Sequence, residues 1–188
     1  PSSAAGLKNS FSFLGAGGGL VGLIGGAGLT ATVKTAIDGL DALNDSAERL
    51  GITAEDLSAL NFAGKLNGVG ADEMAESLKK LSVKMKDDGG KEAGALFDAL
   101  GIKVTDSSGR LKSADAVFAE IAEAFAGMED GAGKTALAVE TFGRAGAKLV
   151  PVLNSGADGL KKMREEGAQL GAIIDGKLAK QAAEFNRS

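Results

Sequence analysis

The chain has 188 residues, a formal net charge of −4, and no His, Cys, Trp or Tyr. Without Cys and His it cannot form a disulfide, the usual zinc, haem or iron–sulfur sites, or a Cys–His or Ser–His–Asp catalytic set. The acidic balance also argues against a general nucleic-acid footprint. We therefore expect no enzyme, no cofactor, no metal and no specific nucleic-acid site.

The first element is a glycine-rich apolar segment. Residues 15–28 read GAGGGLVGLIGGAG, in which eight of fourteen residues are glycine, and residues 9–33 carry no charge. As a helix, residues 9–33 would span about 38 Å, more than a hydrocarbon core of roughly 30 Å. Large apolar side chains are few, so the predicted gain from membrane insertion is marginal. We treat residues 1–33 as a separate segment, with a membrane or channel helix as one reading.

The glycines of this segment recur at four-residue spacing. In a helix they would form a seam of small residues that lets another backbone approach closely. The candidate seam consists of Gly15, Gly18, Gly19, Gly22 and Gly26. Each glycine costs a helix about 1 kcal/mol relative to alanine, so an isolated helix here would not be stable in water. The segment therefore needs lipid, partner copies or surrounding protein.

Two other interpretations of the same segment are weaker. The run Gly17-Gly-Gly-Leu-Val-Gly22 matches the G-x-G-x-x-G spacing of a dinucleotide-binding loop. However, the chain lacks the alternating strands of a parallel sheet, and such a match arises easily where most residues are glycine. A secretory signal peptide would need a small-residue cleavage site of the A-x-A type, which is not clear here.

From Val33 onward the pattern becomes helical. Apolar residues recur at three- and four-residue steps up to Leu50, and Leu50-Gly51-Ile52 predicts a helix that ends with a left-handed glycine. The same Leu-Gly-Ile triplet follows at 100–102. Thr53-Ala-Glu-Asp56 has the spacing of a capping box with Asp in place of Glu, and it predicts a helix that stops at Gly68.

The remaining elements are also mainly helical. The most regular is predicted at about 71–86, where acidic residues near the start and lysines near the end match the helix dipole. Residues 102–111 carry β-branched residues on both sides of a turn and predict a short β-hairpin-like excursion. Further helices are predicted at about 91–100, 114–127, 131–142, 144–154 with an interruption near Pro151, and 157–185 with softening at its glycines. The predicted fold is all-α, with residues 34–188 as one helical region.

Two kinds of motif resemble catalytic or nucleotide sites. Gly131-Ala-Gly-Lys-Thr135 resembles the end of a phosphate-binding P-loop, but the required upstream glycine position holds Met128 and no strand precedes it. The carboxylate pairs Glu120/Glu123 and Glu165/Glu166 are better explained as solvated helix surface than as acid–base dyads.

From about Leu40 to its end, the chain resembles tail-length tape-measure proteins of tailed bacteriophages. The resemblance rests on phrases that occur in order over about three quarters of the chain. They are Asp45-Ser-Ala-Glu-Arg-Leu-Gly-Ile-Thr-Ala-Glu-Asp-Leu57, Ala99-Leu-Gly-Ile-Lys-Val-Thr-Asp106 with Gly109-Arg-Leu-Lys112, Phe125-Ala-Gly-Met-Glu-Asp-Gly-Ala-Gly-Lys-Thr-Ala136, Phe142-Gly-Arg-Ala-Gly-Ala-Lys-Leu-Val-Pro-Val-Leu-Asn154 and Ala182-Ala-Glu-Phe-Asn186. Within this family, Gly131–Thr135 is expected to be a structural helix start.

The resemblance implies a segment of a longer, mostly helical virion protein without a common active site. Such proteins lie in the lumen of the tail tube as several parallel copies, set tail length during assembly, and leave the tube on infection. The implied partners are copies of the same chain, tail tube and tail tip proteins, and the host inner membrane, which the apolar segment would enter to aid DNA passage. The alternative that remains open is a pore-forming helical membrane protein of cellular origin.

Overall fold

The computed structural model describes residues 26–87 and 91–186, with side chains described for 36–87 and 94–186. Within these ranges the regular structure is helical, which confirms the predicted all-α class. In chain order the elements are α2 (Gly26–Leu50), α3 (Ala54–Leu66), α4 (Ala71–Lys86), α5 (Lys91–Leu100), α6 (Ala114–Ala126), α7 (Ala132–Phe142), the 3-10 turn η1 (Gly143–Ala145), α8 (Gly146–Leu153), α9 (Gly156–Gln169) and α10 (Gly176–Asn186).

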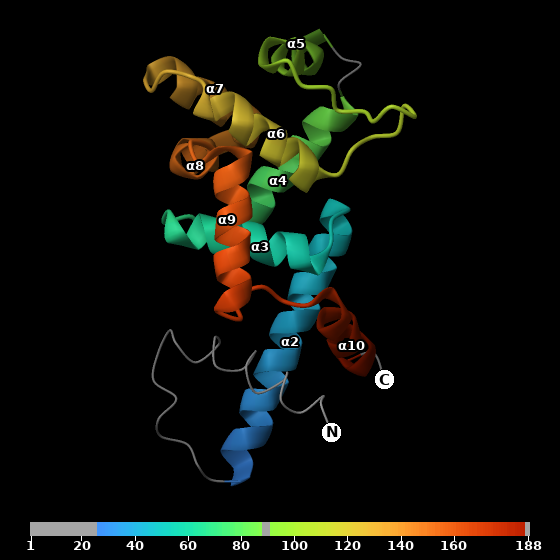
Figure 1. The fold of residues 1–188 in the computed structure, drawn as a ribbon. Helices are drawn as coiled ribbons and strands as arrows, with labels where there is room; N and C mark the ends of the chain where they lie inside the picture. Colours follow the sequence, from blue (N-terminus) through green and yellow to red (C-terminus); the bar gives the residue numbers. More distant parts are fainter. Residues whose placement is uncertain (1–25, 88–90, 187–188) are drawn as a thin grey trace.

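The helices form a crossed bundle from which one long helix projects (Figure 1). Helix α8 packs on α6 and α7, α4 also packs on α6 and α7, and α9 lies across α3 and α6. The long helix α2 runs away from this bundle, and α10, the last helix of the chain, packs along it. The first and last of the described helices are therefore held together by the α2–α10 contact.

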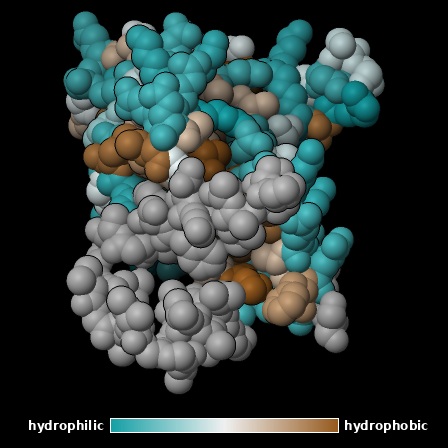
Figure 2. Space-filling view, turned by 60° about the horizontal axis from the view of Figure 1, so that its bottom comes forward, coloured by the Kyte–Doolittle hydropathy of each residue, from teal (hydrophilic) through white to brown (hydrophobic). Residues whose placement is uncertain are grey.

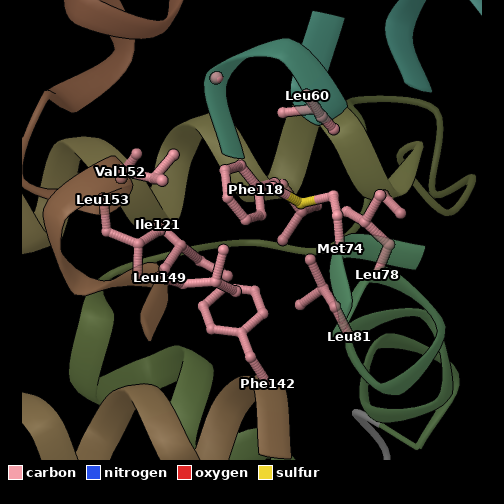
Figure 3. Packing of buried hydrophobic residues seen from close by; sticks show 14 of the residues in the cluster. Leu60, Met74, Leu78, Leu81, Phe118, Ile121, Phe142, Leu149, Val152 and Leu153 are labelled. Carbon is pink, nitrogen blue, oxygen red and sulfur yellow. The ribbon is translucent and has the colours of Figure 1, made fainter. Parts of the chain in front are cut away.

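The core lies where α3, α4, α6, α7 and α8 meet (Figure 3). Met74, Leu78 and Leu81 occupy one face of α4 at steps of four and three residues, and all three are fully buried. Opposite them, the rings of Phe118 and Phe142 lie 5.4 Å apart between their centroids at a tilted angle. Such tilted aromatic pairs add stabilisation beyond the area that they bury. The helical periodicity read from the sequence therefore marks the true core face of α4.

Two helices end as the Leu-Gly-Ile triplets predict. After α2, the N–H of Ile52 donates to the carbonyl of Ala47 at 3.1 Å, and Gly51 has φ +70°. After α5, the N–H of Ile102 donates to the carbonyl of Phe97 at 2.9 Å, and Gly101 has φ +69°. This is the Schellman geometry, in which a left-handed glycine lets the chain satisfy the last helical carbonyls.

Opposite effects are expected from the same substitution at Gly39 inside α2 and at Gly51, which directly follows it. Gly51→Ala should destabilise the fold by about 1–2 kcal/mol, because a left-handed conformation is strained for any residue with a Cβ. Gly39→Ala should stabilise it by up to about 1 kcal/mol, because Gly39 is inside the helix and its added Cβ would meet nothing within 4 Å in the described structure. Urea unfolding of both variants checks this, and equal shifts of the same sign would contradict it.

The predicted hairpin at 102–111 is much reduced in the structure. The segment turns at Asp106, whose carboxylate accepts the backbone N–H groups of Ser108 at 2.8 Å and Arg110 at 3.0 Å. Thr105 and Leu111 form one isolated antiparallel bridge, and the described residues contain no strand. The side chain of Asp106 satisfies the turn locally, so the β-branched residues beside it need not pair further.

Two expectations for the C-terminal third are wrong. Helix α8 continues through Pro151 without interruption. Pro151 cannot donate to the carbonyl of Ala147, but both residues are exposed, so water can take the place of the lost donor. The expected helix at 157–185 is two helices, because α9 ends at Gln169 beside Gly171, which has φ +69°, and α10 begins only at Gly176.

Candidate functional site

The candidate glycine seam lies almost wholly outside the described residues. Gly15, Gly18, Gly19 and Gly22 fall outside them, and Gly26 is the first residue of α2. The helix α2 runs continuously across the proposed boundary between residues 33 and 34. The seam and the division into 1–33 and 34–188 therefore stay predictions.

Among the helices within 26–87 and 91–186, none combines the length and the apolar character that crossing a bilayer requires. Most of the charge-free segment at 9–33 precedes these residues.

The P-loop-like segment at 131–135 forms a helix start. Helix α7 begins at Ala132, and the side chain of Lys134 is only 3% exposed. Its Nζ donates to the carbonyl of Met128 at 3.0 Å and to Asp130 Oδ1 at 2.9 Å. A P-loop lysine must reach outward to a phosphate, whereas this one is held inside the fold. The interpretation as a structural helix start is therefore the better one.

The carboxylates of Glu120 and Glu123 form contacts that stabilise the fold. Glu120 accepts a hydrogen bond from Lys112 Nζ at 2.6 Å, which fastens the 102–113 segment to α6. Glu123 accepts the backbone N–H of Ala157 at 3.1 Å and so caps the start of α9 from another helix. Glu165 and Glu166 are exposed. Within the described residues, no group of three or more acidic side chains is placed to hold a metal ion.

Salt bridges join parts of the chain that are far apart in sequence. Arg164 of α9 donates to Glu55 Oε1 at 2.7 Å and to Asp56 Oδ1 at 2.6 Å, both at the start of α3. The hydrogen bond to the carboxylate of Glu55, followed by that to Asp56, raises the pKa of Arg164. Asp56 also accepts the hydroxyl of Thr53 at 2.5 Å. The sequence showed only the capping role of Asp56, because nothing local marks a partner over a hundred residues away.

Three surface carboxyl groups have pKa values below the usual range. The hydrogen bond from Lys148 lowers the pKa of Glu73, and the backbone N–H of Gly70 lowers it further. The hydroxyl of Ser108 is the main cause for Asp106, and the ammonium of Lys134 is the main cause for Asp130. Each of these carboxylates therefore binds a proton less readily in the folded chain than in the unfolded one.

Stability is expected to fall in acid and to stay level near neutral pH. A carboxyl group whose pKa is lowered by folding stabilises the fold above its unfolded pKa, and this contribution is lost as the pH falls. The usual values are 4.5 for Glu73 and 3.8 for Asp106 and Asp130, so the loss should begin below about pH 5. The chain has no histidine to titrate near neutrality.

Thermal unfolding at a series of pH values tests this expectation. Lys148→Met should make the melting temperature fall less on acidification, because the pKa of Glu73 is then no longer lowered by Lys148. Lys103→Met, at an exposed residue of the loop after α5, should leave the pH dependence of the melting temperature unchanged. A melting temperature that rises on acidification would contradict it.

A hollow with a mainly apolar lining lies between α2 and α3. Its volume is about 460 Å³, within the range of roughly 300–1,000 Å³ seen for ligand pockets. It is lined from α2 by Ala36, Gly39, Leu40 and Leu43, from α3 by Ser58, Asn61, Phe62 and Lys65, and elsewhere by Val69, Gly70, Ala71, Ala172 and Ile174. We call this hollow the α2–α3 groove. Lys65 is its only charged lining residue among those described.

Helix periodicity and one hydrogen bond from the loop between α9 and α10 form the groove. Ala36, Leu40 and Leu43 fall on one face of α2 because their steps are four and three. The loop between α9 and α10 closes the groove, and the N–H of Ile174 donates to Ser58 Oγ at 3.0 Å to hold it there. The sequence predicted the apolar stripe of α2, but not that it is left partly uncovered.

Comparisons with known proteins identify one family. A family model described as "Phage-related minor tail protein" matches residues 24–143. The match covers more than half of the chain and includes the α2–α3 part of the groove. Neither a curated protein nor a solved structure matches the chain.

Proposed function

Because the chain belongs to the phage-related minor tail protein family, we propose that it is part of the tape measure of a bacteriophage tail. Membership in the family makes it a structural protein of the virion tail that associates with other tail components. The finer proposal is that it lies in the lumen of the tail tube, sets tail length during assembly, and leaves the tube on infection. The family match is the observation that carries this proposal.

The sequence phrases support the finer role. The phrases at 45–57, 99–112 and 125–136 fall inside the matched range, and those at 142–154 and 182–186 extend beyond it. The helical fold is of the kind expected for such a protein. The buried and paired Lys134 supports a role without nucleotide chemistry, and we propose that the chain is not an enzyme. Family membership also favours this role over a cellular pore-forming protein.

Several copies are proposed to lie side by side. Large apolar side chains remain exposed on separate helices, including Val83 on α4, Leu66 on α3 and Phe185 on α10. Such residues offer contacts to neighbouring copies or to the tube wall. Cryo-EM of intact tails should show helical density for this chain inside the tube. Tails with an empty lumen, or with this chain only on the outer surface, would overturn the proposal.

The charge-free segment is proposed to enter the host envelope after ejection. Its length suffices to span a bilayer, and its glycines require a surrounding medium other than water. A peptide of residues 9–34 should bind liposomes and become helical, as followed by circular dichroism. A peptide that stays unbound and unfolded at all lipid ratios would remove this part of the proposal and leave the tail role intact.

A further inference from the structure

The α2–α3 groove contains an unsatisfied buried acceptor. Asn61 Oδ1 is buried and has no hydrogen-bond partner among the described residues. Buried polar atoms in native proteins nearly always have a partner, and an unpaired one costs about 1–3 kcal/mol. Asn61 lines the groove together with Phe62 from α3 and Leu40 from α2. The groove therefore offers an apolar surface together with one acceptor that lacks a donor.

The composition of the groove's lining limits what can occupy it. Figure 2 shows that hydrophilic residues dominate the described surface on the side it presents, with hydrophobic residues gathered in separate patches. An occupant of the groove must be apolar and nearly uncharged, because Lys65 is the only charged residue among the described lining. It must also carry an N–H or O–H that can donate to Asn61 Oδ1.

One segment of this chain has that chemistry. Residues 9–25 carry no charge and hold the apolar side chains Phe11, Phe13, Leu14, Leu20, Val21, Leu23 and Ile24. Their many glycines leave backbone N–H groups unscreened by side chains and allow close approach to a surface. An apolar segment of this size is a liability if it stays in water.

The segment is tethered close to the groove. It joins the chain at Gly26, and ten helical residues, about 15 Å, separate Gly26 from Ala36 in the groove wall. About five residues of extended chain cover that distance, so residues up to about 21 can return to the groove. A tether of this kind gives an effective concentration on the order of millimolar, which favours the chain's own segment over that of a second copy.

We propose that the α2–α3 groove holds the chain's own residues 9–25, and that a backbone N–H of this segment donates to Asn61 Oδ1. Apolar side chains of the segment fill the space between α2 and α3. This masks the segment until the chain meets a more favourable apolar environment. The inference concerns the chain in solution and stands or falls independently of the proposed role in tail length.

The test uses paramagnetic broadening in the full chain, which has no natural cysteine. A nitroxide is attached at Lys65→Cys on the rim of the groove, and NMR signals of residues 9–25 are recorded. We expect strong broadening of several of these amides. The same nitroxide at Lys103→Cys, on the loop that follows α5, should leave them sharp. Sharp signals for all of residues 9–25 in the Lys65→Cys sample would overturn the proposal.

A mixture of two differently labelled chains distinguishes binding of the chain's own segment from binding of the segment of another copy. Isotope-labelled chain without nitroxide is combined with unlabelled chain that carries it at Lys65→Cys. The proposal predicts no broadening of residues 9–25 in this mixture, and broadening equal to that in the single-chain sample would assign the groove to a second copy and overturn it.

A variant that places a side chain in the groove tests whether this side chain and residues 9–25 compete for the same space. Position 39 has open space around its Cβ, so Gly39→Phe can place a ring in the groove without a backbone collision. This variant should abolish the broadening, whereas Val83→Phe on the exposed surface of α4 should retain it. Unchanged broadening in Gly39→Phe would also contradict the proposal.

Discussion

Phe118→Ala is expected to destabilise the fold by about 3–5 kcal/mol, the usual cost of removing a buried phenylalanine side chain. Phe118 of α6 is fully buried and faces Phe142 of α7, with ring centroids 5.4 Å apart. The cavity would open between α4, α6 and α7 because the residues around it belong to packed helices (Figure 3). Urea unfolding followed by circular dichroism measures the loss.

A matched control and a double-mutant cycle sharpen this test. Phe185→Ala removes the same side chain from a residue that is 69% exposed, and it should change stability by less than about 0.5 kcal/mol. The combination with Phe142→Ala should show a coupling energy of about 0.5–1.5 kcal/mol if the ring pair contributes beyond its area. Equal effects of Phe118→Ala and Phe185→Ala would show that the described core is wrong.

Gly146→Ala is the second substitution with a large expected effect, about 3 kcal/mol or more. Gly146 begins α8 where it lies against α7, and it is buried there. A Cβ added to it would collide with the carbonyl group of Ala138 and would lie 2.7 Å from the backbone nitrogen of Val139. Overpacking usually costs about 1–3 kcal/mol, and backbone atoms inside a helix yield less than side chains do.

Gly133→Ala in the neighbouring helix α7 is the control for Gly146→Ala. Its added Cβ meets nothing within 4 Å in the described structure, so the change should be neutral or stabilising by up to about 1 kcal/mol. Differential scanning calorimetry of the two variants compares them directly. If Gly146→Ala melts within a degree or two of the unsubstituted chain, α7 and α8 do not pack as described.

Local signals in the sequence predicted much of the helical fold. The helix at 71–86 has the predicted bounds, because charge polarity and apolar spacing agree there. The ends of α2 and α5 were readable because a left-handed glycine followed by an apolar residue is a local device. Such features depend on neighbouring residues alone, so contacts between distant parts of the chain do not change them.

Features that depend on distant contacts were not predictable in the same way. Pro151 was expected to interrupt a helix, but the burial of Leu149 and Val152 on either side stabilises α8 through it. The contact of Arg164 with Glu55 and Asp56 joins two helices that pack together but lie more than a hundred residues apart along the chain. The α2–α3 groove likewise depends on a loop more than a hundred residues away along the chain.

The glycine-rich segment links the proposed function to the described structure. The sequence established that it needs a partner, because a helix with so many glycines is unstable alone in water. The structure adds a groove with an unpaired acceptor within reach of that segment. The same residues are thus proposed to be masked in the groove first and to meet the host envelope later.

The central claim is tested most directly by the length of phage tails. Electron microscopy would compare tails from phage encoding one copy and two tandem copies of residues 26–186. The account predicts uniformly longer tails, by an amount between roughly 40 Å for a compact domain of this size and about 240 Å for a continuous helix. Tails of unchanged length that contain the enlarged chain would contradict the tape-measure role.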